Sequence, residues 1–196
     1  MENHKAWGSG LWRFLHTTSF RYNPSQETEY KKMLMALKQI IPCYTCRQSL
    51  ILPKKRDFES AYTLSYYFYN LHNEINLFLG KGVYKTYEKV RKDYMYCIQP
   101  RFWGPGLWSF MHIASINADR DSLHGLFSFC KTLSVLIPCD SCRAHYIQNT
   151  KDMTTFSTPE KAAKYIYELH NKVNVSIGKK PFKTFPAVYK LYQFKQ

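Results

Sequence analysis

Two Cys-x-x-Cys pairs are the residues of this sequence best suited to chemistry. Cys43 and Cys46 form the first pair, Cys139 and Cys142 form the second, and each pair follows a proline. Proline is favoured at the first position of a helix, so each pair is expected to open one. Backbone N–H groups at a helix start lower the pKa of a thiol, and two cysteines at this spacing can close and reopen a disulfide. We therefore predict redox chemistry, with Cys43 and Cys139 as the more exposed, exchanging sulfurs.

A second block, downstream of each pair, combines an imidazole with two amides and a lysine. The histidine and the second asparagine are four residues apart, so they share one face of a helix. Asparagine offers a donor and an acceptor to a heterocycle, histidine can stack on it, and lysine can meet a phosphate. A single copy would be read as a hydrogen-bonded polar face, but the repeated block predicts a ligand cradle. Its members are His72, Asn73, Asn76 and Lys81 in the first copy, and His170, Asn171, Asn174, Lys179 and Lys180 in the second.

A third block, Trp-Gly-x-Gly-Leu-Trp, precedes both others and supplies flat apolar surface. It runs from Trp7 to Trp12 and again from Trp103 to Trp108, and a histidine follows four residues later, at His16 and His112. An ordinary core turn would explain Trp7 and Trp103 equally well. The Trp-Gly block and the Cys-x-x-Cys pair recur after 96 residues and the His-Asn block recurs after 98, in the same order along the chain. The chain is therefore an internal duplication.

The segments around these blocks read as helices. Apolar residues with helical spacing cover 30–41 and 126–137, and Pro42 and Pro138 then end each helix. Further helices are expected over about 59–80 and 157–178, each ending at Gly-Lys, with variable loops at 53–57 and 149–152. Alternating strand patterns are scarce, so the fold class is all-α. The stretch 84–101 reads as the connection, and we predict a first domain at 1–90, a linker at 91–101 and a second domain at 102–196.

Composition limits the class of protein. The 196 residues carry a net charge of +14, divided equally between the two halves. The N-terminus lacks an apolar signal core, and no apolar run approaches the roughly 18 residues of a membrane helix. We therefore expect a soluble intracellular protein without a membrane partner. In such a protein, paired cysteines favour redox catalysis or metal binding over a structural disulfide framework.

Two alternatives from other classes stay open at this point. The cysteines, alone or with histidine, could bind zinc in a non-catalytic interaction protein. The basic charge could serve nucleic acid, although no basic arm or tail stands out and we regard this partner as the weaker choice. A shared zinc site would not need duplicated Trp, His and Asn blocks, which favours the redox interpretation and no metal.

Taken together, the three blocks resemble the FAD-linked sulfhydryl oxidases of the Erv/ALR type, once in each half. The resemblance implies two tandem domains, each a four-helix bundle with a short fifth helix and an FAD at one end. It implies oxidation of dithiols in protein substrates to disulfides, with oxygen as acceptor and hydrogen peroxide as product. By the same resemblance, Cys46 and Cys142 would face the flavin. One FAD would be held by Trp12, His16, His72, Asn73, Asn76 and Lys81, and the other, more secure one by Trp108, His112, His170, Asn171, Asn174, Lys179 and Lys180.

The sequence also departs from the cellular members of that family. It shows no distal shuttle Cys-x-x-Cys and no further disulfide within the domain, which resembles the compact viral members. The expected setting is then host cytoplasm or nucleus, with virion proteins as substrates. Cys130 falls on an apolar helix face and is expected in the core, whereas Cys97 has no counterpart and is expected to be inert. We further expect the halves to pack as an internal pseudo-dimer, with a second copy of the chain as a further candidate partner.

Overall fold

The described chain is helical throughout, as the sequence predicts. The computed structural model describes residues 4–182 and 184–194, and no strand occurs among them. The first half contains α1 (His4–Ser19), α2 (Glu27–Ile40), α3 (Tyr44–Ser49), α4 (Ala61–Phe78) and α5 (Tyr87–Tyr94), with 3₁₀ turns at Pro24–Gln26 and Lys55–Phe58. The second half contains α6 (Pro100–Ile116), α7 (Leu123–Leu136), α8 (Asp140–Thr150), α9 (Pro159–Ser176) and α10 (Phe185–Tyr192).

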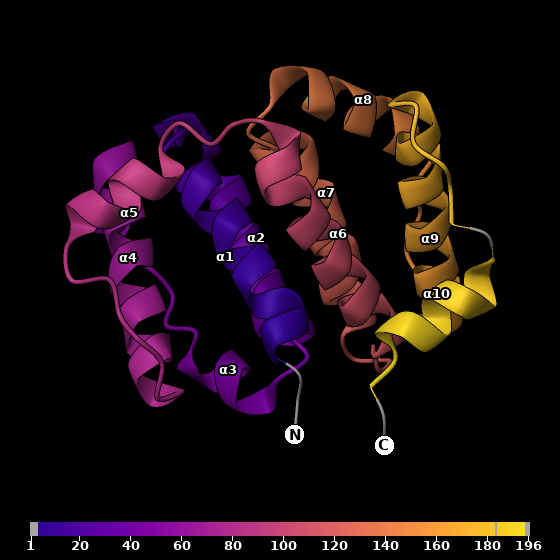
Figure 1. The fold of residues 1–196 in the computed structure, drawn as a ribbon, viewed down its shortest axis with the longest axis horizontal. Helices are drawn as coiled ribbons and strands as arrows, with labels where there is room; N and C mark the ends of the chain where they lie inside the picture. The colour runs from indigo at the N-terminus through magenta and orange to yellow at the C-terminus, as the bar shows by residue number, and fades with distance from the viewer. Residues whose placement is uncertain (1–3, 183, 195–196) are drawn as a thin grey trace.

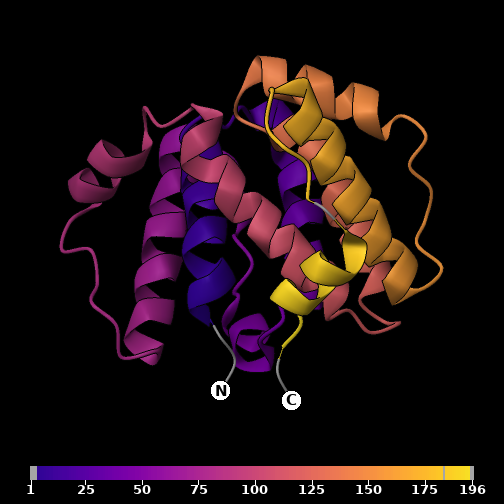
Figure 2. The same ribbon diagram turned by 45° about the vertical axis from the view of Figure 1, so that its right-hand side comes forward.

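The two halves pack against each other through their first two helices. Helix α1 packs against α6, and α2 packs against α7. In Figure 1 these four helices form the centre of the molecule, with α4 and α5 on one flank and α9 and α10 on the other. Helices α3 and α8, which follow the two Cys-x-x-Cys prolines, lie at opposite ends, and the turned view in Figure 2 agrees. This arrangement is the expected internal pseudo-dimer.

Two repeated glycines mark the closest approach of the halves. A Cβ atom built on Gly10 would lie 2.4 Å from the Cα of Gly106, and one built on Gly106 would lie 2.3 Å from the Cα of Gly10. Around them the ring contacts are reciprocal, because Trp7 contacts Phe110 at 6.0 Å and Phe14 contacts Trp103 at 5.9 Å between centroids. The glycines of the Trp-Gly-x-Gly blocks therefore allow α1 and α6 to cross with backbones in contact.

The apolar helix faces read from the sequence form the core. Tyr30, Met33, Leu34 and Leu37 of α2 are at most 1% exposed, and Leu126, Phe129, Cys130 and Leu133 of α7 are 0% exposed. Burying a side chain of the Leu or Phe class contributes about 1.5–3 kcal/mol. Cys130 belongs to this face, as expected, and burial raises the pKa of its thiol to about 12.

The prolines position the redox pairs as predicted. Helix α2 ends at Ile40 and α7 at Leu136, and the next helices begin directly after Cys43 and Cys139. Each of these cysteines is the residue that caps the following helix, with its sulfur accepting a hydrogen bond from the N–H of the second cysteine. Helix α8 extends to Thr150, whereas α3 ends at Ser49. The loop expected at 149–152 therefore begins later than predicted, because Tyr146 and Thr150 are buried and hold the additional turns of α8 against the core.

The stretch 84–101 is not a plain connection, which corrects the sequence interpretation. It contains α5, begun by Thr86, whose hydroxyl accepts a hydrogen bond from the N–H of Lys89. Val90 and Tyr94 bury one face of this short helix, and α10 has the same place in the second half. Residues 91–94, assigned to the linker, are thus helical, and α6 begins at Pro100. The domain boundaries themselves stay a prediction. No helix in the described ranges is long and apolar enough to cross a bilayer.

Candidate functional site

Both Cys-x-x-Cys pairs form disulfides, but the two disulfides differ in exposure. Cys43 joins Cys46, and Cys139 joins Cys142, each with 5.2 Å between the Cα atoms. Cys43 is 0% exposed and Cys46 is 7% exposed, so the expectation that Cys43 is the more exposed sulfur is wrong. Cys139 and Cys142 are both half-buried. The first disulfide is enclosed because Cys43 packs within the hydrophobic core, whereas the second packs against the edge of the core and is partly exposed.

A pocket of about 210 Å³ in the first half brings several predicted residues together. Cys46, Trp12, His72, Asn76 and Lys81 all line it. These residues come from α1, α3, α4 and the turn after α4, so the site forms only when the helices pack. Sequence reasoning missed its apolar walls, which look like ordinary core in a sequence. These walls include Leu11, Leu15, Leu37, Ile41, Leu50, Ile75 and Leu79.

A pair of histidines next to Trp12 anchors this pocket. His16 Nε2 and His72 Nδ1 are 2.9 Å apart, and the ring of Trp12 stacks on His72 with 4.1 Å between centroids. Tyr94 of α5 stacks on the other side, on His16, at 4.6 Å. His16 thus lies behind His72 and does not line the pocket, so it acts on the site by positioning His72.

The second half repeats this arrangement. His112 Nε2 lies 2.9 Å from His170 Nδ1, Trp108 stacks on His170 at 4.2 Å, and Tyr192 stacks on His112 at 4.9 Å. The two stacking tyrosines were not predicted, although their shared spacing of 98 residues was a signal that could have identified them. A structural unit of Trp, two His and Tyr is therefore built twice.

The histidine pairs are held neutral by their surroundings. Burial lowers the pKa of His16 well below its ordinary value, and the charge of His72 lowers it further. Burial, followed by the charge of Lys81, lowers the pKa of His72 to about 4. Burial lowers the pKa of His112 to about 4, and burial with the charges of His112 and Lys179 lowers that of His170 to about 3. Neutral rings also fit the geometry, because a shared hydrogen bond needs one ring nitrogen without a proton.

These pKa values predict an acid-sensitive fold. Between pH 6.5 and 4 the unfolded chain binds protons on histidines that stay neutral in the folded chain, so stability is full above pH 6.5 and falls with decreasing pH. We expect each paired histidine to lower the free energy of unfolding by about 1–2 kcal/mol at pH 5 relative to pH 7.5. Urea unfolding at the two pH values checks this. The variant His112→Gln/His170→Gln should show a weaker pH dependence, and equal stability at both pH values in the unmodified protein would contradict the assignment.

The first asparagine of each block makes hydrogen bonds to the backbone that the sequence did not predict. The amide of Asn73 donates to the carbonyl of Tyr84 at 3.0 Å and accepts from the N–H of Tyr84 at 2.9 Å. Asn171 accepts from the N–H of Phe182 at 2.9 Å in the same way. Each amide thereby fixes the loop after the Gly-Lys turn, which leads to α5 or α10, and Asn73 is not part of the pocket lining.

The Gly-Lys turns are built as predicted. Gly80 and Gly178 have φ values of 62° and 72°, and the N–H groups of Lys81 and Lys179 donate to the carbonyls of Asn76 and Asn174, both at 2.8 Å. Positive φ favours glycine, which ends each helix and turns the following lysine. All three lysines are exposed, and Lys81 lines the rim of the pocket in the first half.

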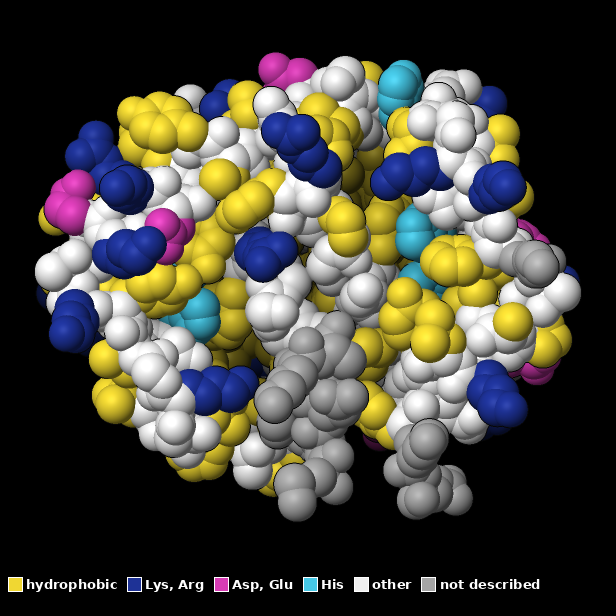
Figure 3. Space-filling view, in the orientation of Figure 1, with side chains coloured by type: hydrophobic (Ala, Val, Ile, Leu, Met, Phe, Trp, Pro, Cys, Tyr) yellow, Lys and Arg dark blue, Asp and Glu magenta, His cyan; other side chains and the backbone are white. Residues whose placement is uncertain are grey.

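Other candidate chemistry lies outside this arrangement. The thiol of Cys97 donates to the carbonyl of Asp93 at 3.0 Å, and burial, followed by the charge of Asp93, raises its pKa. No group of three or more His, Cys, Asp and Glu side chains within the described ranges could hold a metal ion. Lys and Arg side chains are scattered over the face seen in Figure 3, where Asp and Glu are few. The positive charge is thus a property of the surface and not of one patch on that face.

Comparisons with known proteins agree with the duplicated site. The family model described as the Erv1 / Alr family matches residues 9–95 and again 105–193. A relative from Invertebrate iridescent virus 6 is 31% identical over 94 residues, which is 42% of this chain and 85% of the relative. Relatives from Frog virus 3 and Acanthamoeba polyphaga mimivirus are 33% and 29% identical, over 41% and 45% of this chain and 59% and 67% of their own lengths.

All three viral relatives carry the name FAD-linked sulfhydryl oxidase. No solved structure matches the chain. The two family matches together span most of the sequence, and each includes one Cys-x-x-Cys pair and one histidine pair. This chain belongs to the Erv1/Alr family.

Proposed function

We propose that the protein is an FAD-dependent thiol oxidase that forms disulfides in protein substrates, with one FAD site in each half and oxygen as the final acceptor. The observation that supports this most strongly is the shared pocket, where Cys46 of the first disulfide lines the same space as Trp12, His72, Asn76 and Lys81. Viral relatives named FAD-linked sulfhydryl oxidases support the same activity.

The pocket suits the flat part of a flavin. Its walls are mostly apolar, and its polar groups include one amide and one ammonium group, which matches a ring system with a phosphate-bearing tail. Its volume of about 210 Å³ lies below the roughly 300–1,000 Å³ typical of sites that enclose a whole ligand, so it would enclose only part of FAD. Trp12, His72 and Asn76 would hold the ring system, and Lys81 would meet a phosphate. Trp108, His170, Asn174 and Lys179 are proposed to do the same in the second half, with Lys180 as a further phosphate contact.

The chain's own part in the reaction is thiol–disulfide exchange. A substrate thiolate attacks Cys139, the Cys139–Cys142 bond breaks, and a mixed disulfide forms while Cys142 leaves as a thiolate. The second substrate thiolate then attacks the substrate sulfur of the mixed disulfide, which releases the oxidised substrate and leaves Cys139 and Cys142 reduced. The N-terminus of α8 would stabilise a thiolate at Cys139, because the N–H of Cys142 donates to the Cys139 sulfur at 3.3 Å. Bound FAD would accept the two electrons and pass them to oxygen, giving hydrogen peroxide. In the first half Cys46 is proposed to pass electrons to the flavin as Cys142 does, whereas the enclosure of Cys43, which is 0% exposed, makes Cys139 the proposed entry for protein substrates.

A visible spectrum tests this function. We expect the purified protein to show a flavin band at about two flavins per chain, which dithiothreitol bleaches when oxygen is excluded and oxygen restores. Lys81→Gln is expected to weaken flavin retention in the first half and to lower the ratio towards one, because the phosphate contact is lost. A colourless protein that binds zinc would instead support the non-catalytic alternative, and binding that falls steeply with salt would support a nucleic-acid partner.

A further inference from the structure

We propose that the seam between the halves beside Cys139 is a recognition site for an acidic side chain of the substrate protein, next to its cysteine pair. The inference rests on the proposed function, since it assigns a specificity to the substrate that reaches Cys139. It concerns a pocket distinct from the one that Cys46 lines.

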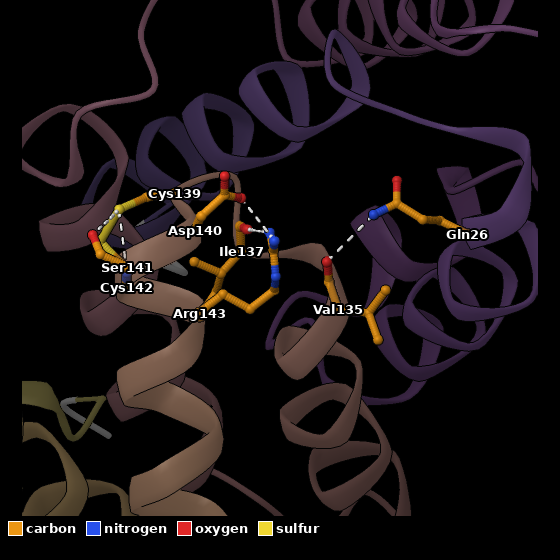
Figure 4. Close-up of polar contacts among 8 residues, drawn as sticks. All are labelled: Gln26, Val135, Ile137, Cys139, Asp140, Ser141, Cys142 and Arg143. Atoms are coloured by element: carbon orange, nitrogen blue, oxygen red, sulfur yellow. Dashed lines mark hydrogen bonds and ion pairs between the residues drawn. A yellow bond between two sulfur atoms is a disulfide. The ribbon is translucent and has the colours of Figure 1, made fainter.

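The seam pocket has a volume of about 170 Å³ and lies where the end of α1, the start of α2, the end of α7 and the start of α8 meet. Pro138 and Asp140, which flank Cys139, form one side together with Arg143. Arg21, after the end of α1, and Gln26, before α2, form the side that belongs to the first half. Gln26 donates across the seam to the carbonyl of Val135 at 3.4 Å (Figure 4).

Two hydrogen bonds hold the guanidinium of Arg143 in place, and other N–H donors of this group remain for a ligand. Its guanidinium donates to the carbonyl of Ile137 at 2.9 Å and to the carboxylate of Asp140 at 2.7 Å (Figure 4). A guanidinium has five N–H donors, so further acceptors can be bound. The Asp140 side chain is 82% exposed and lies on the same helix. Such an exposed pair contributes only about 0.5 kcal/mol, so a second carboxylate can compete for Arg143.

Arg21 adds a second positive charge to the pocket. Its side chain is exposed, and no acidic group within the described ranges forms an ion pair with it. Arg21, Arg143 and Asp140 together leave the pocket with one excess positive charge. The N-terminus of α8, which carries a partial positive charge, also lies at this pocket, and it further favours an anion there.

The duplication creates an equivalent place between the halves beside the first disulfide, here called the opposite seam, and it shows what such an anion could be. There Arg47 takes the place of Arg143, and the other half supplies Asp119. Hydrogen bonds from Ser122 lower the pKa of Asp119, and the charge of Arg47 lowers it further. At the seam beside Cys139 the residue equivalent to Asp119 is Asn23, which is neutral. The other half thus supplies a carboxylate beside the buried first disulfide, whereas beside the half-buried second disulfide it supplies the neutral Asn23, and among the described residues Arg143 pairs only with Asp140 of its own helix.

Competing peptides test the proposal on the flavin-loaded protein. Three reduced Cys-x-x-Cys peptides that differ only in flanking Glu, Gln or Lys are oxidised in turn, and kcat/KM is taken from oxygen uptake. We expect the Glu peptide to exceed the Gln peptide by about three- to fivefold, the size of one well-placed ion pair, and the Lys peptide to be the poorest. Dithiothreitol, which carries no charge, is the reference for basal activity.

Matched variants distinguish binding of the acidic side chain in this pocket from attraction by the net positive charge of the protein. Arg21→Gln should reduce the Glu preference to less than about twofold, whereas Arg120→Gln, an equal charge change on the exposed loop of the other seam, should keep it. Asn23→Asp should also reduce the preference, since it would supply the carboxylate that Asp119 supplies at the opposite seam. All three variants should oxidise dithiothreitol as the unmodified protein does.

Equal kcat/KM for the Glu and Gln peptides, with dithiothreitol still oxidised, would overturn the seam proposal and leave the proposed function intact. An equal loss of preference in Arg21→Gln and Arg120→Gln would also overturn it, because the preference would then follow net charge alone. Failure to oxidise dithiothreitol at all would overturn the proposed function and this inference with it.

Discussion

Replacing Cys139 by serine is expected to slow the oxidation of a protein dithiol by at least about tenfold, whereas Cys43→Ser is expected to slow it by less than about twofold. Exchange requires a substrate thiolate to reach a sulfur atom. Cys139 is half-buried and therefore within reach of a protein substrate, whereas Cys43 is 0% exposed and enclosed in the core. Oxygen uptake with a reduced, unfolded test protein checks both variants.

The control for this comparison is Ser141→Ala, which alters a neighbour 3.3 Å from the Cys139 sulfur and keeps the disulfide. It should retain most of the activity. All variants should keep their flavin band, so that a loss of rate reports exchange and not loss of cofactor. Equal losses in Cys43→Ser and Cys139→Ser would contradict the assignment of the second half as the entry for protein substrates.

Replacing Gly10 by alanine is expected to lower the free energy of unfolding by at least about 2 kcal/mol, because the new methyl group cannot be accommodated. Its Cβ would lie 2.4 Å from the Cα of Gly106, and backbone atoms cannot move aside as a flexible side chain can. The helices α1 and α6 would have to separate, and the core between the halves would loosen. Urea unfolding measures the change.

Gly104→Ala is the matched control for Gly10→Ala. Gly104 belongs to the same repeated block, and a Cβ built on it meets no atom within 4 Å. Alanine in a helix interior is favoured over glycine by roughly 0.5–1 kcal/mol, so this variant should be as stable as the unmodified protein or slightly more stable. If both variants lost the same stability, the close crossing of α1 and α6 would not be what holds the halves together.

The sequence predicts most of the fold because its signals are local and occur twice. The apolar faces at 30–41 and 126–137, the prolines before each cysteine pair and the Gly-Lys turns all lie where the structure has them. Each depends on hydrogen bonding or apolar spacing within a few residues. The repeat also predicts the pseudo-dimer, although only the structure shows that Gly10 and Gly106 meet.

The features that the sequence does not reveal depend on packing between distant segments. Cys43 looks like the exposed member of its pair, and only the assembled core encloses it. The amide of Asn73 also forms two hydrogen bonds with the backbone of Tyr84, eleven residues away, and nothing in the spacing predicts them. Tyr94 stacks on His16 only because α5 folds back onto α1. Each of these depends on tertiary structure that residue type and spacing do not encode locally.

The most direct test of the central claim is dithiothreitol-dependent oxygen uptake by the variant Cys46→Ser/Cys142→Ser. This variant lacks the sulfurs proposed to face the flavin in both halves, while the histidine pairs and the other residues that line the pocket stay unchanged. We predict a loss of at least about 100-fold in rate with the flavin band retained, since serine can neither exchange nor pass electrons. A variant that keeps half or more of the activity of the unmodified protein would contradict a role for these disulfides in the reaction.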